Sequence, residues 1–203
     1  MTTEELIRTF PQPIALIACG PLKGPCGGVI DQFPTVIRMN NFQTQGFEGL
    51  VGSKLSAWCH TCYRWQEKWS IIPRKLGVPE FTWRPLGYPK NQPYADLWRE
   101  ENNPDLIVAA EFYPPMLIKE FKYHGDPSGG LMSLYLFHHL GMPVWHFGYN
   151  SFSDMCHYWG KAISRTNHSQ AEGSVITQMS GVFDGEKHAW LDEVGRLHTA
   201  PRK

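Results

Sequence analysis

The fold is decided by residues 14–56, IALIACGPLKGPCGGVIDQFPTVIRMNNFQTQGFEGLVGSKLS. This stretch begins with a short apolar run, continues into a loop that holds several glycines, and ends with a second apolar run and a polar cluster. A buried strand that leads into a glycine-rich turn is how α/β proteins bring backbone N–H groups close to a phosphate. The glycines do not follow the G-x-G-x-x-G order of a dinucleotide fingerprint, so their spacing alone is a weak signal.

Two strands are predicted on either side of the glycine loop. Ile14–Ala18 is apolar throughout, and Thr35–Met39 is rich in branched residues and alternates. Asn40 and Asn41 follow the second of these strands directly. Because open α/β sheets bind their ligands at the carboxyl ends of the strands, both asparagines lie where a ligand is expected.

The composition favours one α/β domain that spans residues 1–203. Hydrophobic residues make up 42% of the chain and aromatic residues 13%, which is sufficient for a packed core. Nineteen basic residues balance nineteen acidic residues, so the charge gives no support to a surface for nucleic acid or anionic membrane. A charged small molecule remains an allowed substrate.

The chain is expected to be cytoplasmic and to have no membrane span. No apolar run approaches the roughly 20 residues of a spanning helix, and the first residues, MTTEELIRTF, have neither the basic region nor the apolar core of a signal peptide. An odd number of cysteines favours reduced thiols over a disulfide framework. They are Cys19, Cys26, Cys59, Cys62 and Cys156.

Further elements follow from local patterns. A capping box at residues 2–5 predicts a short helix that reaches about Thr9, and Leu106–Ala110 and Val144–Tyr149 are predicted core strands. The tryptophans and Cys62 within 56–69 fall at helical spacing, although residues 55–59 could equally form a strand. The tail from Asp184 is expected to form a hairpin or a short helix on the outside.

Residues 79–104 are rich in proline, tryptophan and tyrosine and poor in aliphatic residues. This composition predicts a long surface loop with one helical turn, which is a natural place for a lid on the acceptor side. A second glycine-rich turn lies at 124–130 and precedes the run LMSLYLFHHL. Ser128 is a good N-cap for a helix over this run, and Gly141 is a good C′ residue.

Four segments carry motif letters in a fixed order along the chain. The first is the opening stretch, with Ile30-Asp31, Val36-Ile37-Arg38-Met39-Asn40, Gly46-Phe47-Glu48 and Val51-Gly52-Ser53-Lys54. The others are PSGGLMSLYLFHHLGMPVWHFGY (127–149), Cys156-His157-Tyr158-Trp159-Gly160, and His168-Ser169-Gln170-Ala171-Glu172. Together they resemble the large, small, third and very small sialylmotifs of the eukaryotic-type sialyltransferase family.

This resemblance implies a fold and a reaction. The family has a single-sheet, Rossmann-like α/β domain and transfers an acidic sugar from its CMP donor with inversion of the anomeric centre. It implies a glycan hydroxyl as acceptor, no metal and no further cofactor, and the sequence has no Asp-x-Asp metal motif. The chain is therefore predicted to be a metal-independent sialyltransferase.

The resemblance also implies which residues act. His168 is expected to be the general base for the acceptor hydroxyl, and His157 is expected to assist the leaving phosphate. Side chains and helix N-termini must stabilise that phosphate when no metal does so. The predicted nucleotide- and phosphate-binding residues are Cys19, Gly20, Asn40, Ser128, Gly129, Gly130 and Gly148.

The chain departs from the family pattern at several positions. The family has an asparagine near Cys19, so Cys19 is expected to act through its backbone. The spacing from His168 to Glu172 is one residue shorter than in the family, which weakens the expected role of the glutamate. The animal enzymes join their large and small motifs by a disulfide, whereas the positions near Ile14 and His139 are not cysteines. These differences indicate a bacterial or viral soluble relative.

Three alternatives remain. Kdo shares with sialic acid both the CMP activation and the anomeric carboxylate, so a CMP-Kdo transferase fits the same motifs. A CMP-binding protein without transferase activity fits the loss of asparagine at Cys19. The sequence Cys59-His60-Thr61-Cys62 suggests a small zinc module, although no second ligand pair lies at a suitable spacing.

Overall fold

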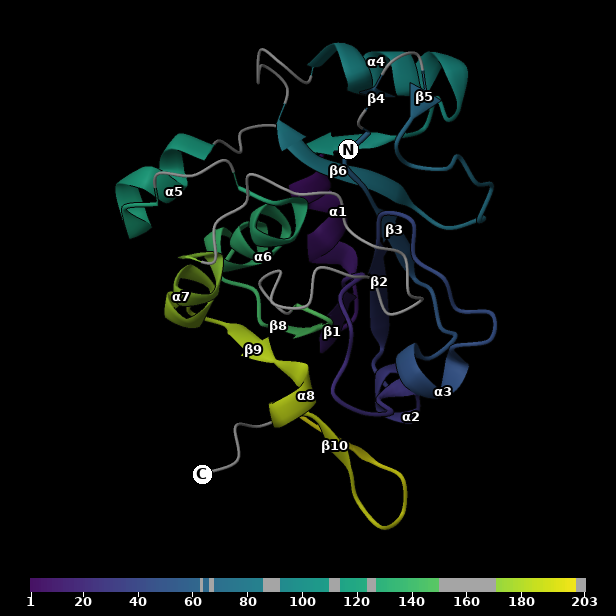
Figure 1. The fold of residues 1–203 in the computed structure, drawn as a ribbon, viewed down its shortest axis with the longest axis vertical. Coiled ribbons are helices and arrows are strands. Elements are labelled where there is room, and N and C mark those ends of the chain that lie inside the picture. Colours follow the sequence, from purple (N-terminus) through teal and green to yellow (C-terminus); the bar gives the residue numbers. More distant parts are fainter. Residues whose placement is uncertain are drawn as a thin grey trace.

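The computed structural model describes residues 1–62, 64–65, 68–85, 92–109, 114–123, 127–149 and 171–199 (Figure 1). Its centre is a seven-stranded sheet with the order β7-β6-β3-β2-β1-β8-β9, in which every neighbouring pair is parallel. The strands of this sheet are β1 (Ile14–Ile17), β2 (Thr35–Met39), β3 (Ala57–Cys59), β6 (Glu80–Pro85), β7 (Ile107–Ala109), β8 (Val144–Phe147) and β9 (Val182–Asp184). The expected α/β fold with a mostly parallel sheet is confirmed.

The remaining elements are helices and two small hairpins. The helices are α1 (Thr3–Thr9), α2 (Gly27–Asp31), α3 (Glu48–Val51), α4 (Gln92–Glu101), α5 (Pro114–Phe121), α6 (Gly129–His139), α7 (Ala171–Gln178) and α8 (Gly185–His188). The hairpins pair β4 (Arg64–Trp65) with β5 (Lys68–Trp69), and β10 (Trp190–Leu191) with β11 (Leu197–His198). The second hairpin extends away from the sheet at the C-terminal end of the chain (Figure 1).

Both faces of the sheet are buried, which explains why its strands are apolar at successive positions. On one face Ile14 and Leu16 of β1 belong to a core that includes side chains of α1, α5, α6 and α7. On the other face Ala15 and Ile17 pack with Ile30 of α2, and a separate cluster joins β3 and β7 to α4. The four residues of β1 therefore alternate between two cores.

The sheet has its topological switch point at β1. Strands β2, β3, β6 and β7 extend to one side of β1, and β8 and β9 to the other, so the chain reverses direction across the sheet after β7. In open parallel sheets, ligands bind outside the carboxyl ends of the strands at such a point. The switch point here lies between the carboxyl ends of β1 and β8, which are directly paired.

A set of polar residues at the opposite edge fixes the loop between α3 and β3. We call Asp31, Arg38, Gly52, Ser53 and Lys54 the amino-edge lock. The Asp31 carboxylate accepts from the backbone N–H groups of Ser53 and Lys54, each at 2.9 Å, and from the Ser53 hydroxyl at 3.1 Å. The fully buried Arg38 donates to the carbonyl oxygens of Lys54 (2.9 Å) and Val51 (2.8 Å).

The lock shows that most letters of the first motif have a structural task. Gly52 has φ +69°, and a Cβ there would lie 2.3 Å from Oδ1 of Asp31, so this position requires glycine. Gly27 permits a similarly close approach of α2 to α3, because its Cβ would lie 2.0 Å from the Glu48 carbonyl oxygen. Met39 is the last residue of β2 and Asn40 follows it, so these two letters of the first motif lie at the carboxyl end of a strand.

Several elements differ from the sequence prediction. Residues 79–104 do not form one long loop, because they contain β6 and the ten-residue helix α4. Two tryptophans of this region are core residues: Trp83 and Trp98 are 4% and 1% exposed. Residues 57–59 are a strand, which decides between the two expected possibilities for that segment. Helix α2 within the glycine loop was not predicted.

Candidate active site at the carboxyl edge

Asn40 lies immediately after β2 in a left-handed conformation, with φ +48°. Asparagine tolerates this conformation better than most residues. Its backbone is held from β3, because its N–H donates to the carbonyl of Cys59 (2.8 Å) and its carbonyl accepts from the Trp58 indole N–H (2.8 Å). Its side-chain Oδ1 is buried and has no hydrogen-bond partner in the part of the chain that the structure describes. The backbone of Asn40 is thus fixed while its amide oxygen is unsatisfied.

Gly20 and Gly148 meet at the switch point. The N–H of Gly20 donates to the carbonyl of Gly148 at 3.1 Å, which continues the pairing of β1 with β8 beyond the strands. Gly148 has φ +70°, and a Cβ there would lie 2.7 Å from the Gly20 carbonyl oxygen. Glycine is therefore required at position 148 for the two turns to approach one another.

Cys19 offers no side chain to a ligand. Its thiol is buried and donates to the carbonyl of Met39 at 3.3 Å, so it ties the end of β1 to the end of β2. Burial raises the pKa of Cys19 to about 12, while the guanidinium groups of Arg74 and Arg38 act in the opposite direction. Both guanidinium groups are therefore close enough to Cys19 to favour negative charge there.

Ser128 caps α6 and is itself held by a buried glutamate. Its hydroxyl accepts from the N–H of Leu131 at 3.1 Å and donates to Oε2 of Glu172 at 2.6 Å. Its backbone N–H donates to Oε1 of Glu172 at 2.7 Å. Glu172 is 2% exposed and begins α7, and the Tyr123 hydroxyl also donates to it at 3.3 Å.

This arrangement defines what the second glycine turn can offer. The N–H and the hydroxyl of Ser128 both donate to Glu172, so Ser128 holds the turn in position. The N–H groups of Gly129 and Gly130, at the first two positions of α6, have no intrahelical acceptor and remain suited to an anion. The carboxyl group of Glu172 is hydrogen-bonded to Ser128 at the same helix end.

Tyr149 connects the two glycine turns. A Cβ added to Gly130 would lie 2.9 Å from Cε1 of Tyr149, and the Tyr149 hydroxyl donates to Sδ of Met39 at 2.9 Å. Burial raises the pKa of Tyr149 well above its ordinary value, with Cys59 and Cys19 adding to the effect, so the phenol stays neutral. The structure thereby brings the start of α6, the end of β8 and the end of β2 to one place. We call Cys19, Gly20, Asn40, Ser128, Gly129, Gly130 and Gly148 the carboxyl-edge site.

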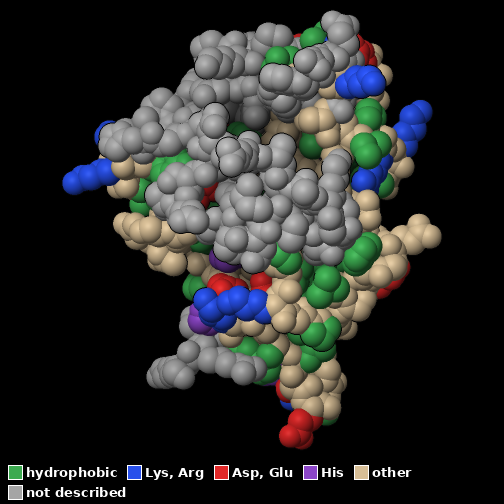
Figure 2. Space-filling view, viewed as in Figure 1, with side chains coloured by type: hydrophobic (Ala, Val, Ile, Leu, Met, Phe, Trp, Pro, Cys, Tyr) green, Lys and Arg blue, Asp and Glu red, His purple; other side chains and the backbone are tan. Residues whose placement is uncertain are grey.

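Charged side chains gather over α8, beside the ends of β8 and β9 (Figure 2). Lys187 pairs with Asp184 at 2.9 Å, and Glu186 accepts from the backbone N–H of Lys23 at 2.8 Å. The second contact joins α8 to the glycine loop after β1. Burial lowers the pKa of His146 on β8 to about 4, while Asp184 opposes the shift, so His146 is neutral at physiological pH.

The two predicted catalytic histidines, His157 and His168, lie outside the described residues, as does every residue of 150–170. Within the described part of the chain, no three His, Cys, Asp or Glu side chains come together as a potential metal site. Cys59 belongs to the core under α6, whereas Cys62 lies in the cluster under α4 beside His60, so the two thiols do not converge on one ion. No described helix combines the length and apolarity needed to cross a bilayer.

Solved structures to which this chain is similar include those of a mammalian sialyltransferase. A mammalian sialyltransferase in complex with Gal-beta-1-3GalNAc-ortho-nitrophenol matches with a TM-score of 0.54 and 18% identity over 83% of this chain and 67% of that one. The chain shares its fold. A second mammalian sialyltransferase structure matches with a TM-score of 0.52 and 17% identity over the same shares. A variant of the sialyltransferase CST-II in complex with CMP gives a TM-score of 0.46 and 12% identity over 87% of this chain and 74% of that one.

At the level of sequence, no protein-family model and no curated protein matches the chain. The likeness therefore establishes the fold, and the function has to be argued from the residues.

Two residues that organise the site were not predicted as site residues. Glu172 stood in the expected very small motif, but its short spacing from His168 was taken to weaken its role, whereas its carboxylate receives bonds from Ser128 and Tyr123. Tyr149 was predicted only as the end of a strand. The contact that gives Glu172 its role joins a serine N-cap to a glutamate in the first turn of another helix, 44 residues later in the chain. Local sequence patterns do not indicate such a contact.

Proposed function

We propose that the chain is an inverting glycosyltransferase that moves an acidic sugar, sialic acid, from its CMP donor to a glycan hydroxyl. The observation that carries this proposal is the unsatisfied Oδ1 of Asn40 at an edge where two glycine turns and the start of α6 meet. A buried amide oxygen without a hydrogen-bond partner costs free energy, and a ligand that donates a hydrogen bond to it removes that cost. The fold shared with mammalian sialyltransferases supports the choice of a CMP-linked donor.

In this proposal the nucleotide lies across the switch point. The amide of Asn40 contacts the ribose or the phosphate, and the N–H groups of Gly129 and Gly130 receive the phosphate oxygens. Gly20 and Gly148 let the backbone approach the nucleotide closely. Arg74 and Arg38, which favour negative charge at Cys19, act in the same direction on an anionic donor in this proposal.

The chemistry is assigned to the two histidines of the third and very small motifs. His168 removes the proton of the acceptor hydroxyl as its oxygen attacks the anomeric carbon, and the bond from that carbon to the phosphate oxygen of CMP breaks. His157 donates a hydrogen bond or a proton to the departing phosphate, so that CMP leaves with its charge stabilised. No metal or other cofactor takes part in this proposal.

A donor screen tests the activity. The purified protein is incubated with CMP-sialic acid or CMP-Kdo in EDTA, and released CMP is measured with and without a panel of glycan acceptors. We expect slow CMP release from CMP-sialic acid without acceptor and faster release with one. Release of CMP from CMP-Kdo but not from CMP-sialic acid would identify Kdo as the donor sugar. Binding of CMP without release from either donor would refute the transferase activity and indicate a CMP-binding protein.

The role of His168 is tested by substitution with alanine. Because general base catalysis contributes about 10²- to 10⁴-fold, we expect His168→Ala to lower kcat by that factor and to change the Kd for CMP by less than about twofold. His198→Ala, on the C-terminal hairpin, is the control and should keep the full rate. Unchanged turnover in His168→Ala would remove this residue from the mechanism.

A further inference from the structure

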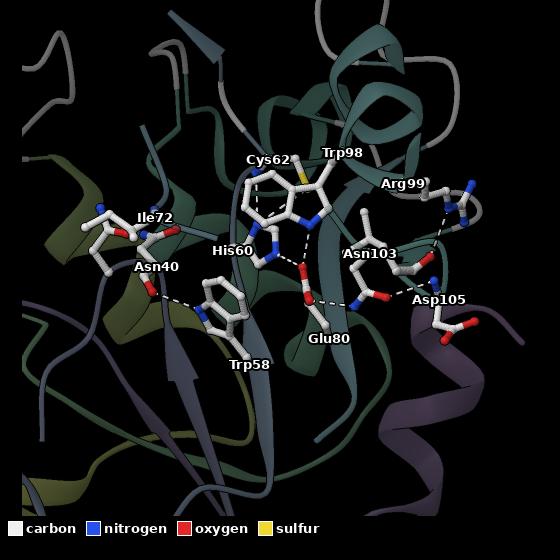
Figure 3. A network of polar contacts seen from close by, with 12 residues as sticks. Asn40, Trp58, His60, Cys62, Ile72, Glu80, Trp98, Arg99, Asn103 and Asp105 are labelled. Carbon is white, nitrogen blue, oxygen red and sulfur yellow. Dashed lines mark hydrogen bonds and ion pairs between the residues drawn. The ribbon is translucent and has the colours of Figure 1, made fainter. Parts of the chain in front are cut away.

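The conformation of Asn40 depends on a buried network that begins 18 residues later in the chain. The Trp58 indole N–H donates to the Asn40 carbonyl at 2.8 Å, and Trp58 is 1% exposed. Figure 3 shows this bond at one end of a row of aromatic and polar side chains that extends to Asn103. The row runs on the side of the sheet that packs against α4.

His60 fixes the plane of the Trp58 ring. The ring centroids of His60 and Trp58 are 4.4 Å apart, and those of His60 and Trp98 are also 4.4 Å apart. The N–H of Cys62 donates to Nδ1 of His60 at 3.2 Å, so the ring proton is on Nε2, which donates to Oε1 of Glu80 at 2.6 Å. With both nitrogens engaged and no exposed surface, His60 has one orientation.

Glu80 anchors the network at the start of β6. Its Oε1 also accepts from the Trp98 indole N–H at 2.5 Å, and its Oε2 accepts from the amide of Asn103 at 2.6 Å. A buried carboxylate is stable only when its oxygens are hydrogen-bonded, and here three donors from separate segments converge on it. The network is therefore rigid at the end remote from Asn40.

We infer that Trp58 is a positioning residue that holds Asn40 in its left-handed conformation, with His60 and Glu80 fixing the indole. A residue with positive φ other than glycine persists when its surroundings hold it there. The bonds from β3 engage the backbone N–H and carbonyl of Asn40 and leave its side-chain amide for a ligand. That the ligand is CMP rests on the function proposed above.

The test replaces the indole and measures two properties. Trp58→Phe keeps a buried aromatic ring but removes the N–H, and the control Trp145→Phe removes a buried indole N–H that has no partner, in the core on the other face of the sheet. The first measurement follows the Asn40 amide resonances by NMR in protein labelled with ¹⁵N-asparagine. The second determines the Kd for CMP by calorimetry, and urea unfolding confirms that both variants are folded.

We expect Trp58→Phe to shift the Asn40 resonances and to weaken CMP binding roughly fivefold, as for the loss of one hydrogen bond, while Trp145→Phe leaves both unchanged. In an Asn40→Gly background, Trp58→Phe should cause no further loss of affinity, because the two residues act as one unit. Asn40 resonances unmoved by Trp58→Phe would overturn the inference. Resonances that move in a protein that does not bind CMP would keep the positioning role and refute the proposed function.

Discussion

The amino-edge lock and the carboxyl-edge site use similar residues for opposite purposes. In the lock, Asp31 accepts three hydrogen bonds from the loop before β3, and Arg38 donates two to the same loop. In the carboxyl-edge site, the backbone of Asn40 is fixed but its Oδ1 has no hydrogen-bond partner among the described residues. The hydrogen bonds of the lock join segments of the chain to one another, whereas the carboxyl-edge site is proposed to bind a ligand.

This difference separates motif letters that hold segments of the chain together from residues that are proposed to bind a ligand. The letters Ile30-Asp31, Arg38 and Val51-Gly52-Ser53-Lys54 hold α2, α3 and the loop before β3 in place. Substitutions in the lock should therefore lower stability, and substitutions in the carboxyl-edge site should lower affinity. Pairs of glycine variants can test this at both edges.

The largest effect is expected for Gly52→Ala in the lock. The new Cβ would lie 2.3 Å from Oδ1 of Asp31 at a residue with φ +69°, so both the clash and the backbone strain destabilise the fold. We expect the free energy of unfolding to fall by about 4 kcal/mol, measured by urea denaturation. The folded fraction should bind CMP with an unchanged Kd.

Gly46→Ala is the matched control for Gly52→Ala. Gly46 also has positive φ, +80°, but a Cβ there would meet no atom within 4 Å. Its substitution should cost only the backbone strain, about 1 to 2 kcal/mol. Equal losses in the two variants would show that the contact with Asp31 contributes nothing to stability.

The second effect is expected at the other edge, for Gly148→Ala. Its Cβ would lie 2.7 Å from the Gly20 carbonyl and 3.1 Å from that of Ala18, so the two turns must move apart. We expect CMP affinity to fall at least tenfold by calorimetry, with a stability loss of about 2 kcal/mol. Gly141→Ala has comparable strain, φ +65°, but open space around it, and should leave the affinity unchanged. If Gly148→Ala loses stability but keeps its affinity for CMP, the ligand does not bind at the switch point.

Much of the fold could be predicted because its signals are local. The capping box at Thr2 and Glu5, the apolar run of β1, the branched residues of β2 and the Ser128 N-cap each depend on a few neighbouring residues. After Asp184, where a hairpin or a short helix is expected, the structure has both. The residues of 79–104 misled the prediction, since proline and tryptophan suggest a loop until the packing of Trp98 against Trp58 is known.

The site could be predicted only in part, for a physical reason. Strand ends and glycine turns are visible in a sequence, so Asn40, Gly20 and the turn before α6 were placed at the carboxyl edge. The contacts that shape the site join distant segments: Trp58 to Asn40, Glu172 to Ser128, and Tyr149 to Met39. Such pairings follow from the three-dimensional packing and have no periodicity along the chain.

The smallest expected effect is a loss of stability at acidic pH, caused by the protonation of histidines near the carboxyl edge. Burial lowers the pKa of His146 from 6.5 to about 4, against the opposing effect of Asp184, and burial also lowers the pKa of His60, against Glu80. The unfolded chain therefore binds more protons than the folded chain between about pH 6.5 and 4, so stability falls as the pH falls through that window.

His146→Gln tests this contribution, because glutamine is polar but does not titrate. For the unsubstituted chain, His146 should contribute a stability loss of about 1 kcal/mol per pH unit between pH 6 and 5, measured by urea unfolding across that range. The variant should lose that part of the slope and keep the part that comes from His60, whereas His198→Gln on the exposed hairpin should behave as the unsubstituted chain does. A slope unchanged by His146→Gln would mean that acid does not act through β8.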